Sequence, residues 1–88
     1  MPLGQFAVHV DAPHPFDARR VAPRFRQEAL LAAFAALRVG ETMRSCHEVE
    51  PAEFVESLTD LYGARLAVVH VSRDPGKIII DAKRLPVS

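Results

Sequence analysis

Hydrophobic residues recur every three or four positions in two stretches of the chain, which is the spacing of an amphipathic helix. The first stretch covers residues 23–37; it opens on proline, is rich in alanine and is followed by Gly40, features that favour a helix with defined ends. The second covers residues 51–63, with proline and acidic residues at its start and glycine at its end. The apolar stripes of these two predicted helices comprise Leu30, Leu31, Phe34 and Leu37 in the first, and Phe54, Val55, Leu58 and Leu61 in the second.

Shorter β-prone stretches flank the predicted helices. Residues 64–71 and 77–85 surround a Pro75-Gly76 pair that suits the centre of a type II turn, so they predict a β-hairpin. Three consecutive isoleucines begin at residue 78, which indicates a strand that is buried on both faces or packed at a subunit contact. Further strands are predicted for residues 5–10, 16–21 and 41–45.

The predicted elements follow the order β-α-β-α-β-β. We therefore expect an α+β fold, a two-layer βαβαββ sandwich in which two helices pack on one face of a four-stranded mixed sheet. A chain of 88 residues has room for one hydrophobic core. Residues 1–88 are thus expected to form a single domain, with the core in residues 16–85 and an irregular segment or short extra strand in residues 1–15.

Charge and cysteine content narrow the classes of function. Eleven basic and eleven acidic residues cancel, which argues against nucleic-acid binding, although four arginines cluster between residues 19 and 26. One cysteine excludes an intramolecular disulfide and favours a cytoplasmic location. The start of the chain lacks the pattern of a signal peptide, and no apolar run is long enough to span a bilayer, so we expect no membrane association.

Residues 46–48 read Cys-His-Glu and form the first candidate site. If they lie in a loop that leads into the second helix, backbone N–H groups there would stabilise a thiolate at Cys46, making it a nucleophile or sulfur acceptor. The alternative is a small buried apolar side chain, as free cysteines usually are.

His47 and Glu48 carry groups that bind first-row metals. Alternation along an extended chain, however, puts Cys46 and Glu48 on one side and His47 on the other. A metal site would then need help from other histidines, and the alternative is a polar loop with helix-capping roles. The histidines available for such a site are His9, His14 and His70.

The second candidate site lies at the start of the first helix. Asp17 and Arg19 are predicted to pair with each other or to bind an anion near the free N–H groups of that helix, with Arg24 and Arg26 in the same region. The alternative is an ordinary solvated surface. A small anionic ligand or an acidic partner protein would suit this cluster of arginines.

Two motifs resemble those of a known family. The first comprises Asp17, Arg19 and Pro23, followed by Phe34, Leu37, Gly40 and Glu41; the second comprises His47 and Pro51, before a helix that ends in Tyr62 and Gly63. Together with the element order, these residues resemble an uncharacterised bacterial branch of the TusA/SirA-like group of sulfur-carrier folds, over about residues 17–85. The motifs depart from that branch at Arg20, Val21, Cys46, Glu48 and Val49, where it has glycine, leucine, aspartate, aspartate and proline.

The resemblance implies the βαβαββ fold but no established activity. The sulfur carriers hold a persulfide on a cysteine directly before the first proline of the first helix; here Ala22 precedes Pro23, and Phe25 replaces their second proline. The carrier chemistry is therefore missing at that position. Relatives are associated with haemerythrin-like and nitrogen-oxide-related proteins, which points to redox or metal physiology.

No nucleophile–base pair emerges from the sequence, so an enzyme is not favoured and no cofactor is required. We predict a small regulatory or accessory module that acts by binding, through a surface formed by residues 17–26 and 46–51. Its partner would be another protein or a small anionic ligand, and the free face of the sheet would suit a homodimer. The alternatives are persulfide transfer through Cys46 and a metal- or haem-related accessory role for His47.

Overall fold

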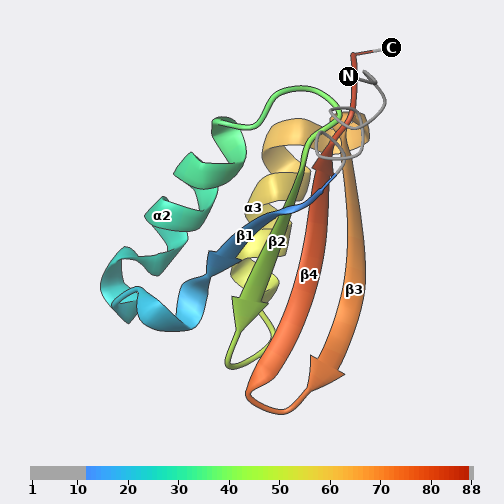
Figure 1. Ribbon diagram of the computed structural model, residues 1–88. Coiled ribbons are helices and arrows are strands. Elements are labelled where there is room, and N and C mark those ends of the chain that lie inside the picture. Colours follow the sequence, from blue (N-terminus) through green and yellow to red (C-terminus); the bar gives the residue numbers. More distant parts are fainter. Residues whose placement is uncertain (1–11, 88) are drawn as a thin grey trace, which may run out of the picture.

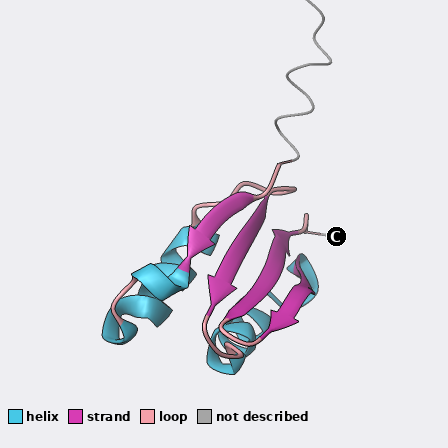
Figure 2. Cartoon of the chain, turned by 60° about the horizontal axis from the view of Figure 1, so that its bottom comes forward, coloured by secondary structure: helices cyan, strands magenta, loops and turns pink. Residues whose placement is uncertain are grey.

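Two helices cover one face of a four-stranded sheet in the computed structural model, which describes residues 12–87 (Figures 1 and 2). This arrangement confirms the predicted α+β fold. Short 3₁₀ turns, η1 (Ala18–Arg20) and η2 (Gly63–Arg65), precede α2 and β3. The main elements are β1 (His14–Asp17), α2 (Pro23–Ala35), β2 (Thr42–His47), α3 (Ala52–Tyr62), β3 (Leu66–Asp74) and β4 (Lys77–Arg84).

The strand order β1-β2-β4-β3 fixes where the two helices begin. β1 and β2 run parallel, whereas β4 is antiparallel to both β2 and β3. Parallel neighbours end at the same edge of a sheet, and here β1 leads through η1 into α2 while β2 leads into α3. The starts of both helices therefore meet at one edge (Figure 1).

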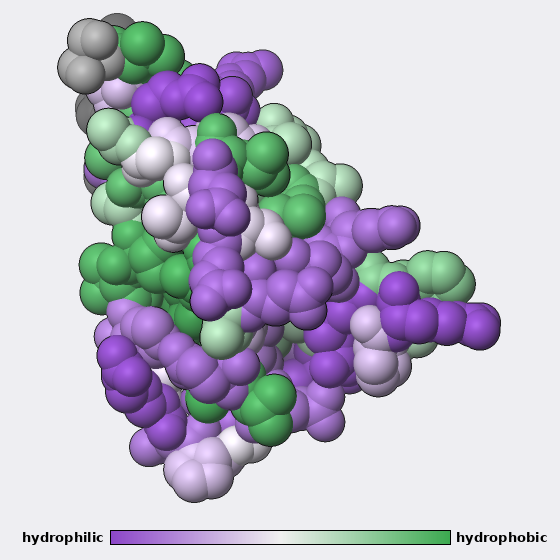
Figure 3. Space-filling view, turned by 180° about the vertical axis from the view of Figure 1, so that it is seen from behind, coloured by the Kyte–Doolittle hydropathy of each residue, from purple (hydrophilic) through white to green (hydrophobic). Residues whose placement is uncertain are grey.

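The core lies between the helices and the sheet. Along β2 the burial alternates: Met43, Ser45 and His47 are buried against the helices, whereas Arg44 is exposed on the open face and Cys46 is half-buried there. Other fully buried side chains include Phe34, Phe54, Leu58 and Ile80. Viewed from behind, the helix side shows a broad hydrophilic area in the middle, with apolar side chains along the left margin (Figure 3).

The isoleucine run does not form a strand that is buried on both faces. Ile80 and Ala82 are buried on the helix side of β4, while Ile79 and Asp81 are only half-buried and Lys83 is exposed. The alternation of β4 is therefore that of a sheet with one covered face. This excludes the first of the two explanations drawn from the sequence.

The hairpin between β3 and β4 forms as predicted. Asp74 pairs with Lys77, so Pro75 and Gly76 make the turn, and Gly76 has φ of 76°. A type II turn requires a positive φ at its third residue, which is the reason that glycine stands there.

Several predicted boundaries were wrong. The first strand of the hairpin, expected over residues 64–71, is Leu66–Asp74. The strand expected over residues 16–21 ends at Asp17, because its carboxylate accepts a hydrogen bond from the Arg19 backbone N–H (3.1 Å) and turns the chain into η1. The first helix ends at Ala35, not Leu37. The strand expected over residues 41–45 runs on to His47, because its register pairs it with β4 as far as Ile78.

Cys46 and His47 consequently lie in a strand rather than in a loop. β1 also begins inside residues 1–15, where an irregular segment or a short extra strand was expected. The strand predicted for residues 5–10 lies outside the described part of the chain. Within residues 12–87, no helix combines the length and the apolar composition that crossing a bilayer requires.

Candidate ligand site between the two helix N-termini

A cavity of about 300 Å³ opens between α2 and the connection from β2 to α3. α2 contributes one wall, and the end of β2 and the first turn of α3 contribute the other. We name it the His47 cavity. Its lining includes Pro23, Arg26, Leu30, His47, Pro51 and Phe54. The two chain segments predicted to share a surface are thus brought together.

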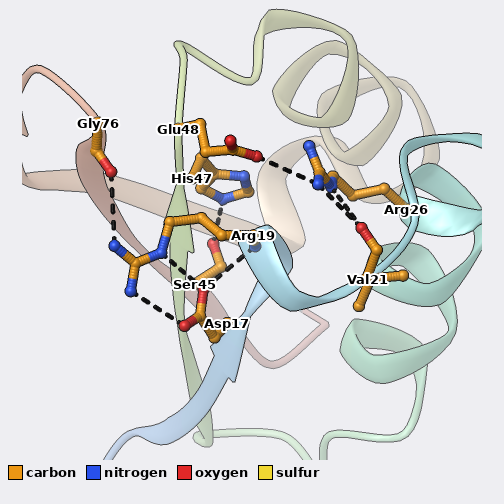
Figure 4. A network of polar contacts seen from close by, with 8 residues as sticks. All are labelled: Asp17, Arg19, Val21, Arg26, Ser45, His47, Glu48 and Gly76. Carbon is orange, nitrogen blue, oxygen red and sulfur yellow. Dashed lines mark hydrogen bonds and ion pairs between the residues drawn. The ribbon is translucent and has the colours of Figure 1, made fainter.

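His47 is the polar side chain at the base of this cavity. It is 4% exposed, and its Nε2 lies 2.7 Å from the Ser45 hydroxyl oxygen (Figure 4). That hydroxyl donates its proton toward the Ile80 carbonyl, at 3.5 Å. We assign the single Ser45 proton to the Ile80 carbonyl, so that the imidazole donates from Nε2 and Nδ1 carries the lone pair.

The second ring nitrogen of His47 faces the cavity. Nδ1 makes no hydrogen bond to any group in residues 12–87, yet no fully buried side-chain nitrogen or oxygen in this part of the chain lacks a partner. Nδ1 is therefore not fully buried and is accessible to solvent. Since His47 lines the cavity, that opening is where Nδ1 is accessible.

The surroundings of His47 keep its ring neutral. Burial is the main cause that lowers the pKa of His47 below its usual value of 6.5, and the positive charge of Arg26 lowers it further. Glu50 and Asp17 act in the opposite direction without reversing the shift. At neutral pH the ring thus offers a lone pair to the cavity rather than a positive charge.

Arg26 of α2 ties the two sides of the site together. Its Nε and one terminal nitrogen donate to the Val21 carbonyl at 3.1 and 2.9 Å, and the same terminal nitrogen lies 3.2 Å from a Glu48 carboxylate oxygen (Figure 4). The Arg26 side chain is 24% exposed. Its position is therefore fixed by contacts with Val21 and Glu48, and it holds Glu48 at the rim.

The first turn of α3 presents unused donors at this cavity. Pro51 is the N-cap and supplies no side-chain hydrogen bond, while the Ala52 N–H donates to the Glu50 carbonyl at 3.0 Å. In the described part of the chain, the N–H groups of Glu53 and Phe54 have no acceptor. Both residues line the cavity, so these donors lie at its wall.

Asp17 and Arg19 are occupied with each other. The Arg19 guanidinium makes two hydrogen bonds to the Asp17 carboxylate, at 2.9 and 3.0 Å, and also approaches the Gly76 carbonyl at 3.5 Å (Figure 4). This pairing with Arg19 lowers the pKa of Asp17. The pair joins the end of β1 to the β3–β4 turn, outside the His47 cavity.

Cys46 lies on the opposite face of β2 from His47. It lines a separate shallow groove of about 240 Å³ on the open side of the sheet, with Asp17, Arg19 and Arg44 among its neighbours. Cys46, His47 and Arg19 therefore do not converge on one pocket. Arg24 is also apart: its guanidinium stacks 4.8 Å from the centre of the Phe25 ring, and it lines none of these hollows.

Within residues 12–87, no three His, Cys, Asp or Glu side chains lie close enough together to hold a metal ion. Two features of the site were not predicted from the sequence: the hydrogen-bond partner of His47 at Ser45, and the cavity wall at Phe54. The signal for Ser45 was its spacing of two from His47, which places both on one face of a strand. The wall depends on helix packing, which the sequence does not display.

Fold and site together define a class: a two-layer α+β domain with a ligand-sized cavity at the starts of its two helices. A family model described as an uncharacterized conserved protein (DUF2249) matches residues 15–84. The chain belongs to this family. No curated protein and no solved structure matches it.

Proposed function

We propose that this protein is a small-ligand-binding module of TusA-like fold that acts in the cytoplasm as a regulatory or accessory protein, without catalysing a reaction. The ligand occupies the His47 cavity. The observation that carries this proposal is the neutral, buried His47 ring with its unpaired Nδ1 turned to the cavity.

An imidazole at this core position is not the side chain that stability alone would favour. The Ser45 hydrogen bond satisfies Nε2 but leaves Nδ1 without a partner in the described part of the chain, whereas an apolar side chain at the same core position would need no polar partner. Perturbed titratable groups that line hollows cluster at functional sites. A volume of about 300 Å³ is at the lower end of the range for small-molecule sites.

The TusA-like assignment rests on the element order and on the start of α2. Ala22 is the N-cap of α2, and Pro23 is the first residue of this helix. The resemblance gives the position of Ala22 to a carrier cysteine. With alanine there, the module keeps the helix start without the thiol. Binding at the neighbouring cavity is then the role that the remaining chemistry supports.

Chemical-shift mapping tests the proposal. We expect members of a fragment library that includes small anions to shift the amide signals of Gln27, His47 and Phe54 in a saturable way. Ala52→Trp, which places an indole at the cavity mouth, should abolish these shifts, while Glu56→Trp on an exposed position of the same helix should not. Shifts that survive Ala52→Trp unchanged, or no shifts at all, would reject the site.

Sulfur transfer through Cys46 is a second candidate, favoured by the basic groups at its groove: Arg19, Arg44 and Lys77. The Cys46 thiolate would attack the outer sulfur of a donor persulfide, forming a Cys46 persulfide as the donor thiolate departs. Intact mass after incubation with a cysteine desulfurase and cysteine tests it. A gain of one sulfur that Cys46→Ser removes supports it, and no gain, or an equal gain in the variant, rejects it.

A further inference from the structure

We propose that the ligand of the His47 cavity is a free α-amino acid with an apolar side chain. This inference rests on the proposed function and names the ligand class. It follows from a juxtaposition on one small cavity of donors suited to a carboxylate, acceptors suited to an ammonium group and apolar walls.

The carboxylate would be received by the first turn of α3. The N–H groups of Glu53 and Phe54 have no acceptor in the described part of the chain, and the start of an 11-residue helix favours negative charge. A second observation points to a ligand at the same place. His47, more than nine-tenths buried, turns an unpaired ring nitrogen into this cavity.

The ammonium group would be received by acceptors. Nδ1 of the neutral His47 offers a lone pair, and the carboxylates of Glu48 and Glu50 stand at the rim. Each of these glutamates has one basic contact, Glu48 with Arg26 and Glu50 with His70. Carboxylate oxygens accept several hydrogen bonds, so capacity remains for an ammonium N–H.

Ligands with one charge fit only part of this arrangement. An anion would satisfy the free N–H groups and face Arg26, but it would offer no donor to Nδ1 or to the rim carboxylates of Glu48 and Glu50. An amine would satisfy the carboxylates and Nδ1 but would meet the positive end of α3 and the fixed Arg26 charge. A zwitterion matches both sets, because an α-amino acid carries its carboxylate and its ammonium group on the same carbon atom.

The remaining surface suits an apolar side chain. Leu30 and Phe54 are buried side chains whose edges reach the cavity, and Pro23, Val49 and Pro51 complete the apolar part of the lining. A cavity of about 300 Å³ accommodates one amino acid but not a dipeptide with large side chains. Leucine is therefore the probe of choice.

Isothermal titration and chemical-shift mapping with leucine and two analogues test the inference. 4-Methylpentanoate lacks the amino group, and 3-methylbutylamine lacks the carboxylate, while both keep the branched apolar chain. We expect saturable binding of leucine, with shifts at His47 and Phe54, and a Kd at least about tenfold weaker for each analogue, equivalent to one lost charged hydrogen bond.

An analogue that binds in the cavity as tightly as leucine would overturn the amino-acid assignment and leave the cavity as a binding site. If leucine does not bind in the cavity while other fragments do, the amino-acid assignment is rejected and the proposed function is not. If no compound binds in the cavity, both the amino-acid assignment and the proposed function are rejected.

Variants separate the two halves of the site. His47→Phe keeps a ring of similar size and leaves the Ser45 hydroxyl bonded to Ile80, so we expect a folded protein with leucine affinity reduced about tenfold. Glu48→Gln, at an exposed position, should weaken leucine but not 4-methylpentanoate. Unchanged leucine affinity in a folded His47→Phe, or equal weakening of both ligands by Glu48→Gln, would overturn the ammonium site.

Discussion

His47 occupies a position that the alternation of β2 assigns to the core. An imidazole is tolerated there because its Nε2 is hydrogen-bonded to Ser45, two residues earlier on the same face. The nearest aromatic neighbour, Phe54, lies with its ring centre 6.0 Å from that of His47. Apolar packing on one side and an open ring edge on the other make His47 both a structural and a candidate functional residue.

The lowered pKa of His47 predicts a loss of stability in mild acid. The unfolded chain takes up a proton at this ring near pH 6.5, while the folded protein resists protonation until a lower pH. His47 therefore contributes fully above about pH 6.5, and this contribution is lost as pH falls toward the folded-state pKa, at up to about 1.4 kcal/mol per pH unit. Urea unfolding at a series of pH values measures it.

His47→Gln is the matched control for the acid effect, because glutamine does not titrate. We expect the variant to be less stable than the wild type at neutral pH. Its free energy of unfolding should change less than that of the wild type between pH 6.5 and 5. Retention of the full wild-type slope in His47→Gln would show that other groups cause it.

At the scale of elements, the end of α2 depends on the last strand. The Arg84 guanidinium donates to the carbonyls of Ala35 (3.1 Å) and Leu37 (2.6 Å), two groups that a helix end leaves without intrahelical partners. It also lies 5.6 Å from the centre of the Tyr62 ring on α3. One side chain thus connects both helices to β4.

Arg84→Met should destabilise the protein by about 1–3 kcal/mol, because it leaves two carbonyls unpaired and removes a charged donor. Thermal and urea unfolding measure the change. Lys83→Met, one residue earlier and exposed on the open face, should alter stability by less than about 0.5 kcal/mol. Equal effects of the two substitutions would contradict the role given to Arg84.

Periodicity predicted the helices and the hairpin to within a few residues because these elements carry their signals locally. It failed at β1, where Pro15 argues against a strand. That strand is an edge, where proline is tolerated, and parallel pairing with β2 maintains it. Such pairing joins segments 29 residues apart, as in His14 with Met43, and leaves no local signature.

The candidate site was predictable in outline only. Parallel neighbours and helix starts pointed to one edge of the sheet, and alternation separated Cys46 from His47. The sequence could not show that Arg26 reaches back to Val21 and across to Glu48. Nor could it show that Asp17 and Arg19 satisfy each other rather than a ligand.

At the scale of the whole molecule, the open face of the sheet is neither fully polar nor fully apolar. Val69, 59% exposed, and the half-buried Ile79 flank an ion pair in which Arg44 approaches Asp81 at 2.8 Å. A homodimer through this face stays a prediction. Sedimentation equilibrium should find twice the mass of the 9.7 kDa chain, and Val69→Lys should return it to the monomer; a monomeric wild type would end the hypothesis.

The central claim for the whole molecule is that it folds around a neutral His47 whose Nδ1 is open to a ligand cavity. Nitrogen-15 NMR of the imidazole in the full chain at pH 7 tests this most directly, because the two ring nitrogens differ strongly in shift between tautomers and between charge states. We predict a neutral ring with the proton on Nε2 and the lone pair on Nδ1. A charged ring at pH 7, or a proton on Nδ1, would contradict the account.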